Sequence, residues 1–250
     1  MSTTCEPDVA ALPIGSATMS PAMAHADRYA RYLYDSVRPW LAAPVLEIGT
    51  GFGTYTGLLL NHGRVITADI DPVCLEEARR RYPSADLQTA VVDLNDRSIV
   101  ARLSQYGANS IFCSNVLEHI DDDVAALSGL HDAIAPGGAI CIIVPAHQRL
   151  YGFMDQAAGH FRRYTRRTLE WKLADSGWCV EKSFYVNALG GAGWWLNQRL
   201  LSPRPLDAPS INTQLAFYDR FVVPMARVVD PFFRDSFGLS VVAIARRTSR

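Results

Sequence analysis

The stretch Val45-Leu46-Glu47-Ile48-Gly49-Thr50-Gly51-Phe52-Gly53 carries the strongest structural signal in the chain. Three of its first four residues are apolar and predict a buried strand, and glycines follow at alternate positions. Glycine permits a tight turn and a close approach of a ligand to the backbone, and a helix that begins after the turn directs its N–H groups at that ligand. The stretch therefore predicts a strand, a ligand-binding turn and a helix.

Apolar runs alternate with helical patterns downstream of this turn. We expect strands at 65–68, 87–92, 110–114 and 139–144, separated by helices at 72–82, 98–106 and 123–134. Such alternation is typical of a parallel sheet with crossover helices. Beyond Pro145 the alternation stops, but a helix at 168–176, a strand at 178–185, a helix at 212–229 and a last strand at 240–245 are still expected. The predicted fold is a doubly wound, mostly parallel seven-stranded α/β sheet of the Rossmann-like kind with helical lid insertions.

The predicted domain organisation is simple. Residues 1–24 are rich in Ser, Thr, Ala and Pro and are interpreted as a flexible N-terminal arm. Aromatic and apolar residues at helical spacing predict an amphipathic helix from His25 to Trp40. We expect residues 25–250 to form a single domain, of which residues 146–235 contribute a lid.

Composition narrows the class of ligand. Lys and Arg number 24 against 25 Asp and Glu, so no net electrostatic field favours nucleic acid or an anionic membrane. The five cysteines form no disulfide framework or metal-ligand spacing, which indicates a reducing compartment. No signal peptide and no membrane span are expected, because no apolar run approaches about 18 residues. We therefore expect a cytoplasmic protein that acts on a small molecule.

A second motif lies at the end of the second predicted strand. Asp69 follows Glu47 by 22 residues. In a doubly wound sheet, a carboxylate at this position reaches the ribose hydroxyls of a nucleoside held over the glycine turn. Asp71 is the alternative, although it precedes Pro72 and is also suited to capping the next helix.

The glycine spacing discriminates between cofactors. A dinucleotide fingerprint requires a glycine where Thr54 stands. Instead Glu47 leads the motif, and an acidic group suits a ligand that carries an ammonium while it repels a pyrophosphate.

Together with further motifs, residues Val45 to Pro145 resemble the class I S-adenosylmethionine-dependent methyltransferase family. These motifs are Val92-Asp93-Leu94, Ser114-Asn115-Val116-Leu117-Glu118-His119, and Ala135-Pro136-Gly137-Gly138. The chain is most similar to the branch with Leu-Glu-His-Ile after the fourth strand, whose members methylate many unrelated small molecules. The resemblance therefore implies S-adenosyl-L-methionine as cofactor and leaves the acceptor, including one from secondary metabolism, unidentified.

The resemblance also implies roles for individual residues. The glycine turn would border the methionine part of the cofactor, Glu47 its amino group, and Asp69 its ribose. The full set of expected cofactor-binding residues is Glu47, Gly49, Thr50, Gly51, Gly53, Asp69, Ile70, Asp93, Leu94 and Asn115.

The acceptor should be bound beyond the carboxyl ends of the strands, where open α/β sheets bind their ligands. His147 and His160 are the candidate catalytic bases. The candidate substrate-binding residues are Tyr29, Tyr32, Tyr151, Arg162, Arg163, Tyr164 and Trp194. A solvated basic loop explains the segment around residues 146–166 equally well, and Tyr185, Asn187, Trp194 and Trp195 could line a pocket or belong to the core. His119 is interpreted as a packing or capping residue in preference to a base, and no metal site is expected.

The function predicted from the sequence is transfer of a methyl group to an oxygen or nitrogen of a small-molecule acceptor, by a monomer or homodimer. One alternative is a non-catalytic protein that binds S-adenosylmethionine. The other is an NAD(P)-dependent oxidoreductase, which the residue at position 54 argues against.

Overall fold

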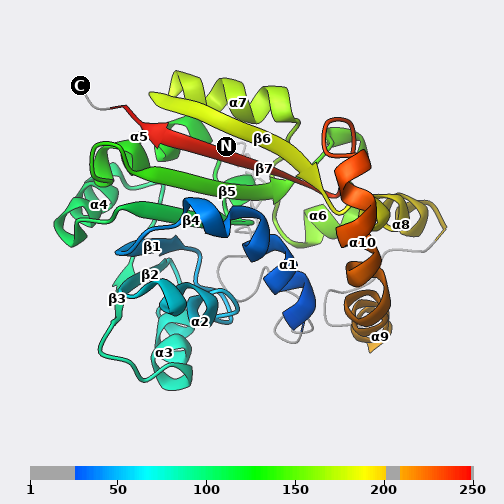
Figure 1. The fold of residues 1–250 in the computed structure, drawn as a ribbon, viewed down its shortest axis with the longest axis horizontal. Helices are drawn as coiled ribbons and strands as arrows, with labels where there is room; N and C mark the ends of the chain where they lie inside the picture. The colour runs from blue at the N-terminus through cyan, green and yellow to red at the C-terminus, as the bar shows by residue number, and fades with distance from the viewer. Residues whose placement is uncertain (1–25, 201–208, 249–250) are drawn as a thin grey trace, which may run out of the picture.

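The computed structural model describes residues 26–200 and 209–248, and within them seven strands form one sheet (Figure 1). The strands are β1 (Val45–Ile48), β2 (Val65–Asp69), β3 (Leu87–Val91), β4 (Ser110–Ser114), β5 (Ala139–Pro145), β6 (Trp178–Val186) and β7 (Ser240–Arg247). Their order is β3-β2-β1-β4-β5-β7-β6; the first five are parallel, and β7 runs antiparallel between β5 and β6. The predicted doubly wound, mostly parallel seven-stranded sheet is confirmed. The arm expected over residues 1–24 lies outside the described residues.

Helices cover both faces of the sheet. The α-helices are α1 (Asp27–Val37), α2 (Thr56–Leu59), α3 (Pro72–Arg81), α4 (Arg97–Ala101), α5 (Asp123–Ala133), α6 (Phe153–Ala157), α7 (Arg166–Asp175), α8 (Ala188–Leu200), α9 (Pro209–Phe217) and α10 (Val223–Val229). Short helical turns are η3 (Arg38–Trp40), η4 (Leu60–His62), η5 (Arg102–Tyr106), η6 (Leu117–His119), η7 (Gln148–Leu150), η8 (Tyr218–Val222) and η9 (Asp230–Phe232).

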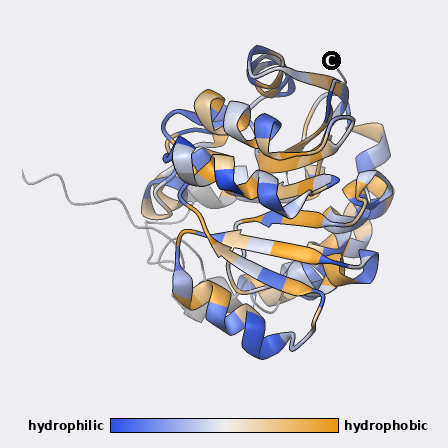
Figure 2. Cartoon of the chain, turned by 90° about the vertical axis from the view of Figure 1, so that its left-hand side faces the viewer, coloured by the Kyte–Doolittle hydropathy of each residue, from blue (hydrophilic) through white to orange (hydrophobic). Residues whose placement is uncertain are grey.

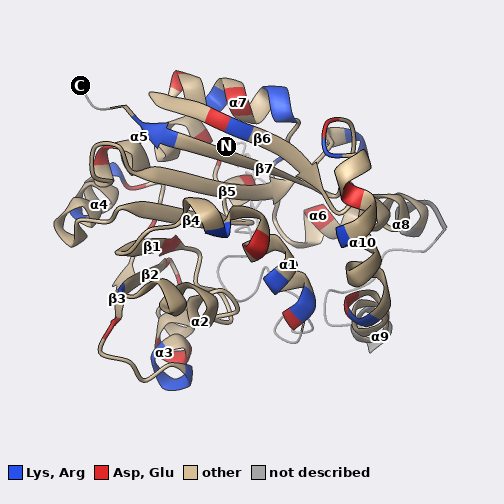
Figure 3. Cartoon of the chain, in the orientation of Figure 1, with Lys and Arg blue, Asp and Glu red and all other residues tan. Residues whose placement is uncertain are grey.

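Two hydrophobic clusters sandwich the sheet because successive strand residues point to opposite faces. On β5, Ile140 and Ile142 join α5 and α7 in one cluster, whereas Cys141 and Ile143 join α1 and α10 in the other. The strands are accordingly hydrophobic along most of their length (Figure 2), and the charged side chains lie mainly on the outer helices and loops (Figure 3). The result is a three-layer α/β arrangement.

The region after β5 contains helices that the sequence did not predict. The Gly- and Trp-rich stretch forms α8, and the single helix expected at 212–229 is divided by the π-helical turn η8 between α9 and α10. Gly191 of α8 approaches Phe237 so closely that a Cβ there would lie 2.9 Å from the ring. Glycine lowers helix propensity, so tertiary packing outweighs local preference in this helix.

Within the described parts of the chain, no helix combines the length and the apolar character needed to cross a bilayer.

The junction before β7 provides a test of this packing. Gly238 is buried, and a Cβ on it would lie 2.3 Å from the backbone carbonyl oxygen of Val186. Since this backbone pairs with β7, it has no room to move. We expect Gly238→Ala to lower the free energy of unfolding in urea by about 2 kcal/mol.

Gly193→Ala is the matched control, because residue 193 is exposed in α8 and no atom lies within 4 Å of its added Cβ. It should be neutral or stabilise the protein by up to about 1 kcal/mol. Equal effects of the two substitutions would contradict the close approach at Gly238.

Candidate functional site

The glycine turn after β1 has the backbone conformation that its sequence predicts. Gly49, Gly51 and Gly53 have φ values of +82°, +51° and +71°, in the left-handed region that side chains disfavour. The packing at Gly49 is also tight, because a Cβ there would lie 2.4 Å from Cγ2 of Val116, which follows β4. The turn therefore lies directly against the segment after β4.

Glu47 is fully buried on β1 and ties the turn to its surroundings. Its Oε2 accepts hydrogen bonds from the hydroxyls of Thr56 on α2 and Thr67 on β2, each at 2.6 Å. Its Oε1 has no hydrogen-bond partner. Burial is the main cause that raises the pKa of Glu47 to about 7, and nearby Asp69 adds to the shift. The unpartnered oxygen is a natural place for a cationic ligand group.

Asp69, the last residue of β2, and Asp71, two residues beyond it, have different roles. The carboxylate of Asp69 accepts hydrogen bonds from the backbone N–H groups of Gly51 at 3.0 Å and Asp71 at 2.9 Å, so it joins the end of β2 to the glycine turn. Asp71 accepts from Val73 N–H at 2.9 Å and caps α3, as its alternative interpretation proposed. Burial raises the pKa of Asp69 despite these hydrogen bonds.

The other expected cofactor-binding residues also follow the parallel strands. Thr50 is buried, with its hydroxyl 2.6 Å from that of Thr67. Half-buried Ile70 follows β2, Asp93 and buried Leu94 follow β3, and exposed Asn115 follows β4. Because parallel strands end at the same edge of the sheet, the structure gathers all of these residues at one edge.

Strained backbone is concentrated at this edge. Asn115, His147 and Asn187 are the described non-glycine residues with positive φ, at +53°, +60° and +68°. They follow β4, β5 and β6, which run in the same direction. Such strain persists only where the surrounding structure enforces it and is typical of functional sites.

His147 lies between two aromatic rings. Its imidazole stacks on Tyr185 at 4.6 Å and on Phe237 at 5.1 Å, and its buried Nε2 has no hydrogen-bond partner. Burial and then the charge of Arg163 lower the pKa of His147, so the ring is neutral near pH 7. A neutral imidazole with an unpartnered nitrogen is chemically suited to accept a proton.

Asp155 organises the segment after β5. Its fully buried carboxylate accepts hydrogen bonds from Arg163 Nε at 2.8 Å and Gly152 N–H at 2.9 Å, and its Oδ1 lies 2.9 Å from His160 Nδ1. Burial alone would raise the pKa of Asp155, but the His160 and Arg163 contacts lower it below its usual range. The carboxylate is thus ionised and holds the imidazole in a fixed orientation.

The other expected acceptor residues in this segment have partners within the protein. Tyr151 donates a hydrogen bond to the carbonyl oxygen of His160 at 2.7 Å. The guanidinium of Arg162 lies 3.0 Å from Asp123, and the Tyr164 hydroxyl lies 2.7 Å from the same carboxylate. Trp194 donates to the carbonyl oxygen of Leu150 at 3.1 Å, and Arg163 packs over its ring at 4.9 Å. These contacts hold the basic segment at residues 146–166 against the rest of the domain.

A polar network at the ends of β6 and β7 contains the expected aromatic residues of α1. The Tyr32 hydroxyl is hydrogen bonded to Asp230, and the backbone N–H of Asn187 donates to that hydroxyl at 3.1 Å. Tyr29 contacts Tyr218 edge to face at 5.8 Å. Both Tyr29 and Tyr32 are largely buried, so the packing of α1 brings their rings beside the carboxyl edge of the sheet.

Tyr55 is a site residue that sequence reasoning missed. Its ring packs on Phe112 at 4.8 Å, and burial followed by the proximity of Tyr29 raises its pKa well above the usual range, with Glu47 a further contributor. It therefore lies between the glycine turn and α1. Its place immediately after the glycine motif is the one signal that could have identified it.

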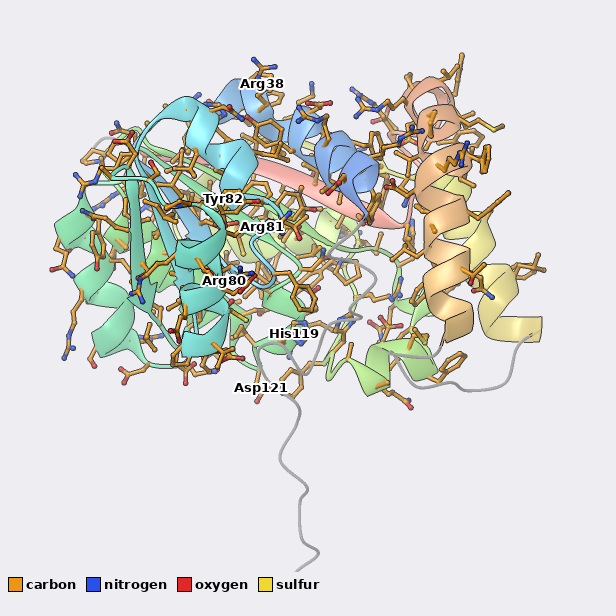
Figure 4. The ribbon with its side chains drawn as sticks, turned by 90° about the horizontal axis from the view of Figure 1, so that it is seen from below. Arg38, Arg80, Arg81, Tyr82, His119 and Asp121 are labelled. Carbon is orange, nitrogen blue, oxygen red and sulfur yellow. The ribbon has the colours of Figure 1, made fainter. Side chains whose placement is uncertain are left out.

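Glu118, His119 and His160 form a second group that the sequence did not predict. Figure 4, which shows the molecule from below, labels His119 in the region between α3 and α6. The His119 and His160 rings meet edge to face at 4.7 Å, and His160 Nε2 lies 4.0 Å from Glu118 Oε1. The Glu118 side chain is fully buried, and neither carboxylate oxygen has a hydrogen-bond partner.

The contact between Gly49 and Val116 yields a prediction. Gly49→Ala should lower the free energy of unfolding in urea because it combines left-handed strain with a steric clash. Adding Val116→Ala to the Gly49→Ala variant should restore part of the lost stability, because it removes the Cγ2 atom that clashes. We expect a coupling free energy of about 1–2 kcal/mol between the two positions. Strictly additive effects would show that the turn does not pack against the segment after β4.

The comparisons with known proteins agree with this geometry. Residues 46–140 match the sequence model of a family described as the methyltransferase domain. Uncharacterized methyltransferases of Mycobacterium tuberculosis and Mycobacterium bovis are each 30% identical over 112 residues, which are 44% of this chain. The chain spans about half the length, 55%, of these relatives.

Solved structures share the fold. One is the complex between the Haloferax volcanii Trm112 methyltransferase activator and the putative methyltransferase, with a TM-score of 0.58, 15% identity and coverage of 94% of this chain and 99% of that one. A second is an S-adenosylmethionine-dependent methyltransferase from Mesorhizobium loti, with a TM-score of 0.56, 15% identity and coverage of 86% and 98%. Taken together, these findings show that residues 46–140 resemble a methyltransferase domain and that the described chain shares the fold of these methyltransferases.

Proposed function

We propose that this protein transfers a methyl group from S-adenosylmethionine to an oxygen or nitrogen atom of a small-molecule acceptor. The observation that carries the proposal is the conjunction of a left-handed glycine turn, an Asp69 carboxylate hydrogen bonded to that turn, and a buried Glu47 oxygen without a partner. Each feature matches one part of the cofactor.

The residues of the glycine turn fit the cofactor by shape and by charge. The turn, which has no Cβ at positions 49, 51 and 53, would allow the methionine part to approach the backbone. The unpartnered Oε1 of Glu47 would face its ammonium, since an ionised carboxylate in a buried position needs a cation nearby. The carboxylate of Asp69 would accept hydrogen bonds from the ribose hydroxyls. Adenine would lie among Ile70, Asp93 and Leu94, after β2 and β3.

The acceptor would lie beyond β4, β5 and β6. Asn115, His147 and Asn187 mark that region through their strained backbones. Tyr29 and Tyr32 of α1, together with Tyr151 and Trp194, would border it, and the contacts of Arg162, Arg163 and Tyr164 keep the segment after β5 in place. We propose that residues 146–235 form the acceptor side of a single domain.

Bound S-adenosylmethionine supplies an electrophilic methyl group on a sulfonium. The protein's part is to hold the acceptor atom in line with that methyl and to exclude water. Transfer would form a bond between the acceptor atom and the methyl carbon and break the carbon–sulfur bond, with S-adenosylhomocysteine as the second product. His147 or His160 takes the proton of a hydroxyl or protonated amine acceptor; the neutral, unpartnered Nε2 favours His147 for this role.

The class of acceptor, the compartment and the oligomeric state are also part of this proposal. The small-molecule acceptor follows from the balanced net charge and not from any bound ligand. We propose a cytoplasmic monomer or homodimer. A structural relative from Haloferax volcanii was solved in complex with the activator Trm112, so a mass measurement of the purified chain with and without candidate protein partners is the direct check.

Asp69 and Asp71 allow a matched test of cofactor binding. Asp69→Asn should weaken S-adenosylhomocysteine binding by about 10- to 100-fold, because a charged acceptor of ribose hydrogen bonds is lost. Asp71→Asn should leave binding unchanged, since asparagine caps α3 as well as aspartate does. Titration calorimetry measures both affinities. Equal affinities for the parent and the Asp69 variant would refute the assigned site.

The pKa of Glu47 predicts a pH dependence of cofactor binding. In the ligand-free protein this carboxyl is about half protonated near pH 7. An ammonium binds the ionised form, so binding releases a proton and the affinity for S-adenosylhomocysteine should fall as the pH drops below about 7. The loss should approach about tenfold per pH unit at lower pH.

Glu47→Gln serves as the control for this profile. Glutamine preserves an oxygen that accepts hydrogen bonds from Thr56 and Thr67 but does not titrate. The variant should bind more weakly than the parent at pH 8 and show a flat profile between about pH 5.5 and pH 8. A flat profile in the parent would contradict the ammonium contact.

A further inference from the structure

We propose that Glu118, His119 and His160 form a binding site for one divalent transition-metal ion, for which Zn²⁺ is the probe. One ligand atom from each residue lies within 4.8 Å of the other two. Two imidazoles and one carboxylate form a donor set that suits zinc and other first-row divalent metals. Three protein ligands leave at least one coordination position open.

The unpartnered polar atoms around this group support the proposal. Both carboxylate oxygens of Glu118 are buried without a hydrogen-bond partner, and Nδ1 of His119 is also buried and unpartnered. Buried polar groups in native proteins are almost always satisfied, so unsatisfied atoms on adjacent residues require an explanation. A single cation would satisfy the atoms on both residues.

The second ring completes the geometry. His160 presents Nε2 towards Glu118 at 4.0 Å while its Nδ1 lies 2.9 Å from Asp155. A carboxylate on the far nitrogen of a histidine is the usual support for a metal ligand, because it fixes the ring and makes the other nitrogen a better donor. Two further contacts hold His160 beside η6: Phe161 N–H donates to the Glu118 carbonyl at 2.8 Å, and Tyr151 donates to the His160 carbonyl.

The local charges favour a cation. Glu118 and Asp155 supply two carboxylates, whereas Arg163 is the one arginine or lysine among the described residues that forms a salt bridge with them, through Asp155 at 2.8 Å. Neighbouring Arg162 is neutralised separately by Asp123 at 3.0 Å and Asp121 at 3.3 Å.

Only a small adjustment is needed to form the site. Ligand bonds of about 2.1 Å in a tetrahedral site place the ligand atoms roughly 3.4 Å apart. The present spacing of up to 4.8 Å requires the side chains to close by about 1 Å, which terminal torsions of histidine and glutamate allow. Access is available, because the His160 side chain is 16% exposed and His119 is half-buried.

The position of the site suggests its use. Val116, two residues before Glu118, packs against Gly49 of the glycine turn, so the ion would lie near the proposed cofactor site. This role rests on the proposed function: the open coordination position would take an oxygen of the acceptor and lower its pKa. His160 then acts as a ligand, and His147 remains the candidate base.

The test uses the full-length protein after treatment with a chelator and removal of that chelator. Competition with a chromophoric chelator should show one equivalent of Zn²⁺ bound with micromolar or tighter affinity. Co²⁺ in its place should give visible absorption bands of a four- or five-coordinate nitrogen–oxygen site. Glu118→Gln and His160→Ala should each weaken Zn²⁺ binding by at least about 100-fold.

His131→Ala is the matched control. His131 also has a buried, unpartnered Nε2, but it packs on Trp178 away from the cluster, so its loss should not change Zn²⁺ affinity. S-adenosylhomocysteine binding reports the fold of each variant and should be retained in all of them. Two outcomes would overturn the metal site: millimolar Zn²⁺ affinity in the parent protein, or parent-like Zn²⁺ affinity in both ligand variants. The first outcome is expected if a proton, and not a metal ion, satisfies the Glu118 carboxylate.

The same measurements separate the two proposals. Zn²⁺ binding without S-adenosylhomocysteine binding would support the metal site and count against the proposed function. S-adenosylhomocysteine binding without Zn²⁺ binding would count against the metal site alone.

Discussion

The carboxylate of Glu47 holds together the part of the fold on which the site depends. It is buried within β1, yet it receives the hydroxyl of Thr67 from β2 and that of Thr56 from α2. These contacts fix the glycine turn between β1 and α2, and Asp69 then fastens the turn to the end of β2. Burying an acidic group costs free energy, and hydrogen bonds to one oxygen recover only part of it. Under the proposed function, the ammonium of the cofactor would supply the partner that the second oxygen of Glu47 lacks.

Sequence reasoning predicted the central sheet because its signals are local. Each parallel strand is a short apolar run beside a turn, and Asp69 is identified by its position after β2. Long-range packing explains what was missed. α8 contains glycines that lower helix propensity, but Phe237 packs against the backbone of Gly191 and requires the absence of a side chain. His119 and His160 are 41 residues apart, and they are brought together by long-range contacts such as the hydrogen bond from Phe161 N–H to the Glu118 carbonyl. No periodicity in the sequence could reveal such a pairing.

The proposed acceptor side is held together by different interactions from those of the proposed cofactor side. The glycine turn uses backbone shape, which any chain with the motif can adopt. The segment after β5 depends on side-chain pairs instead: Arg163 with Asp155, and Arg162 with Asp123. Such contacts hold an irregular segment in place without fixing which groups face the ligand. This difference is consistent with a family in which the cofactor site is shared and the acceptor varies.

Glu47 and Glu118 share one property that links the two sides. Both are fully buried, burial raises the pKa of each to about 7, and each has at least one oxygen without a partner. Two such carboxylates oppose folding, since the unfolded chain solvates both. Val116 lies between them, packed on the turn that Glu47 supports and two residues before Glu118. Under the two proposals above, a cation beside each carboxylate would offset part of this cost.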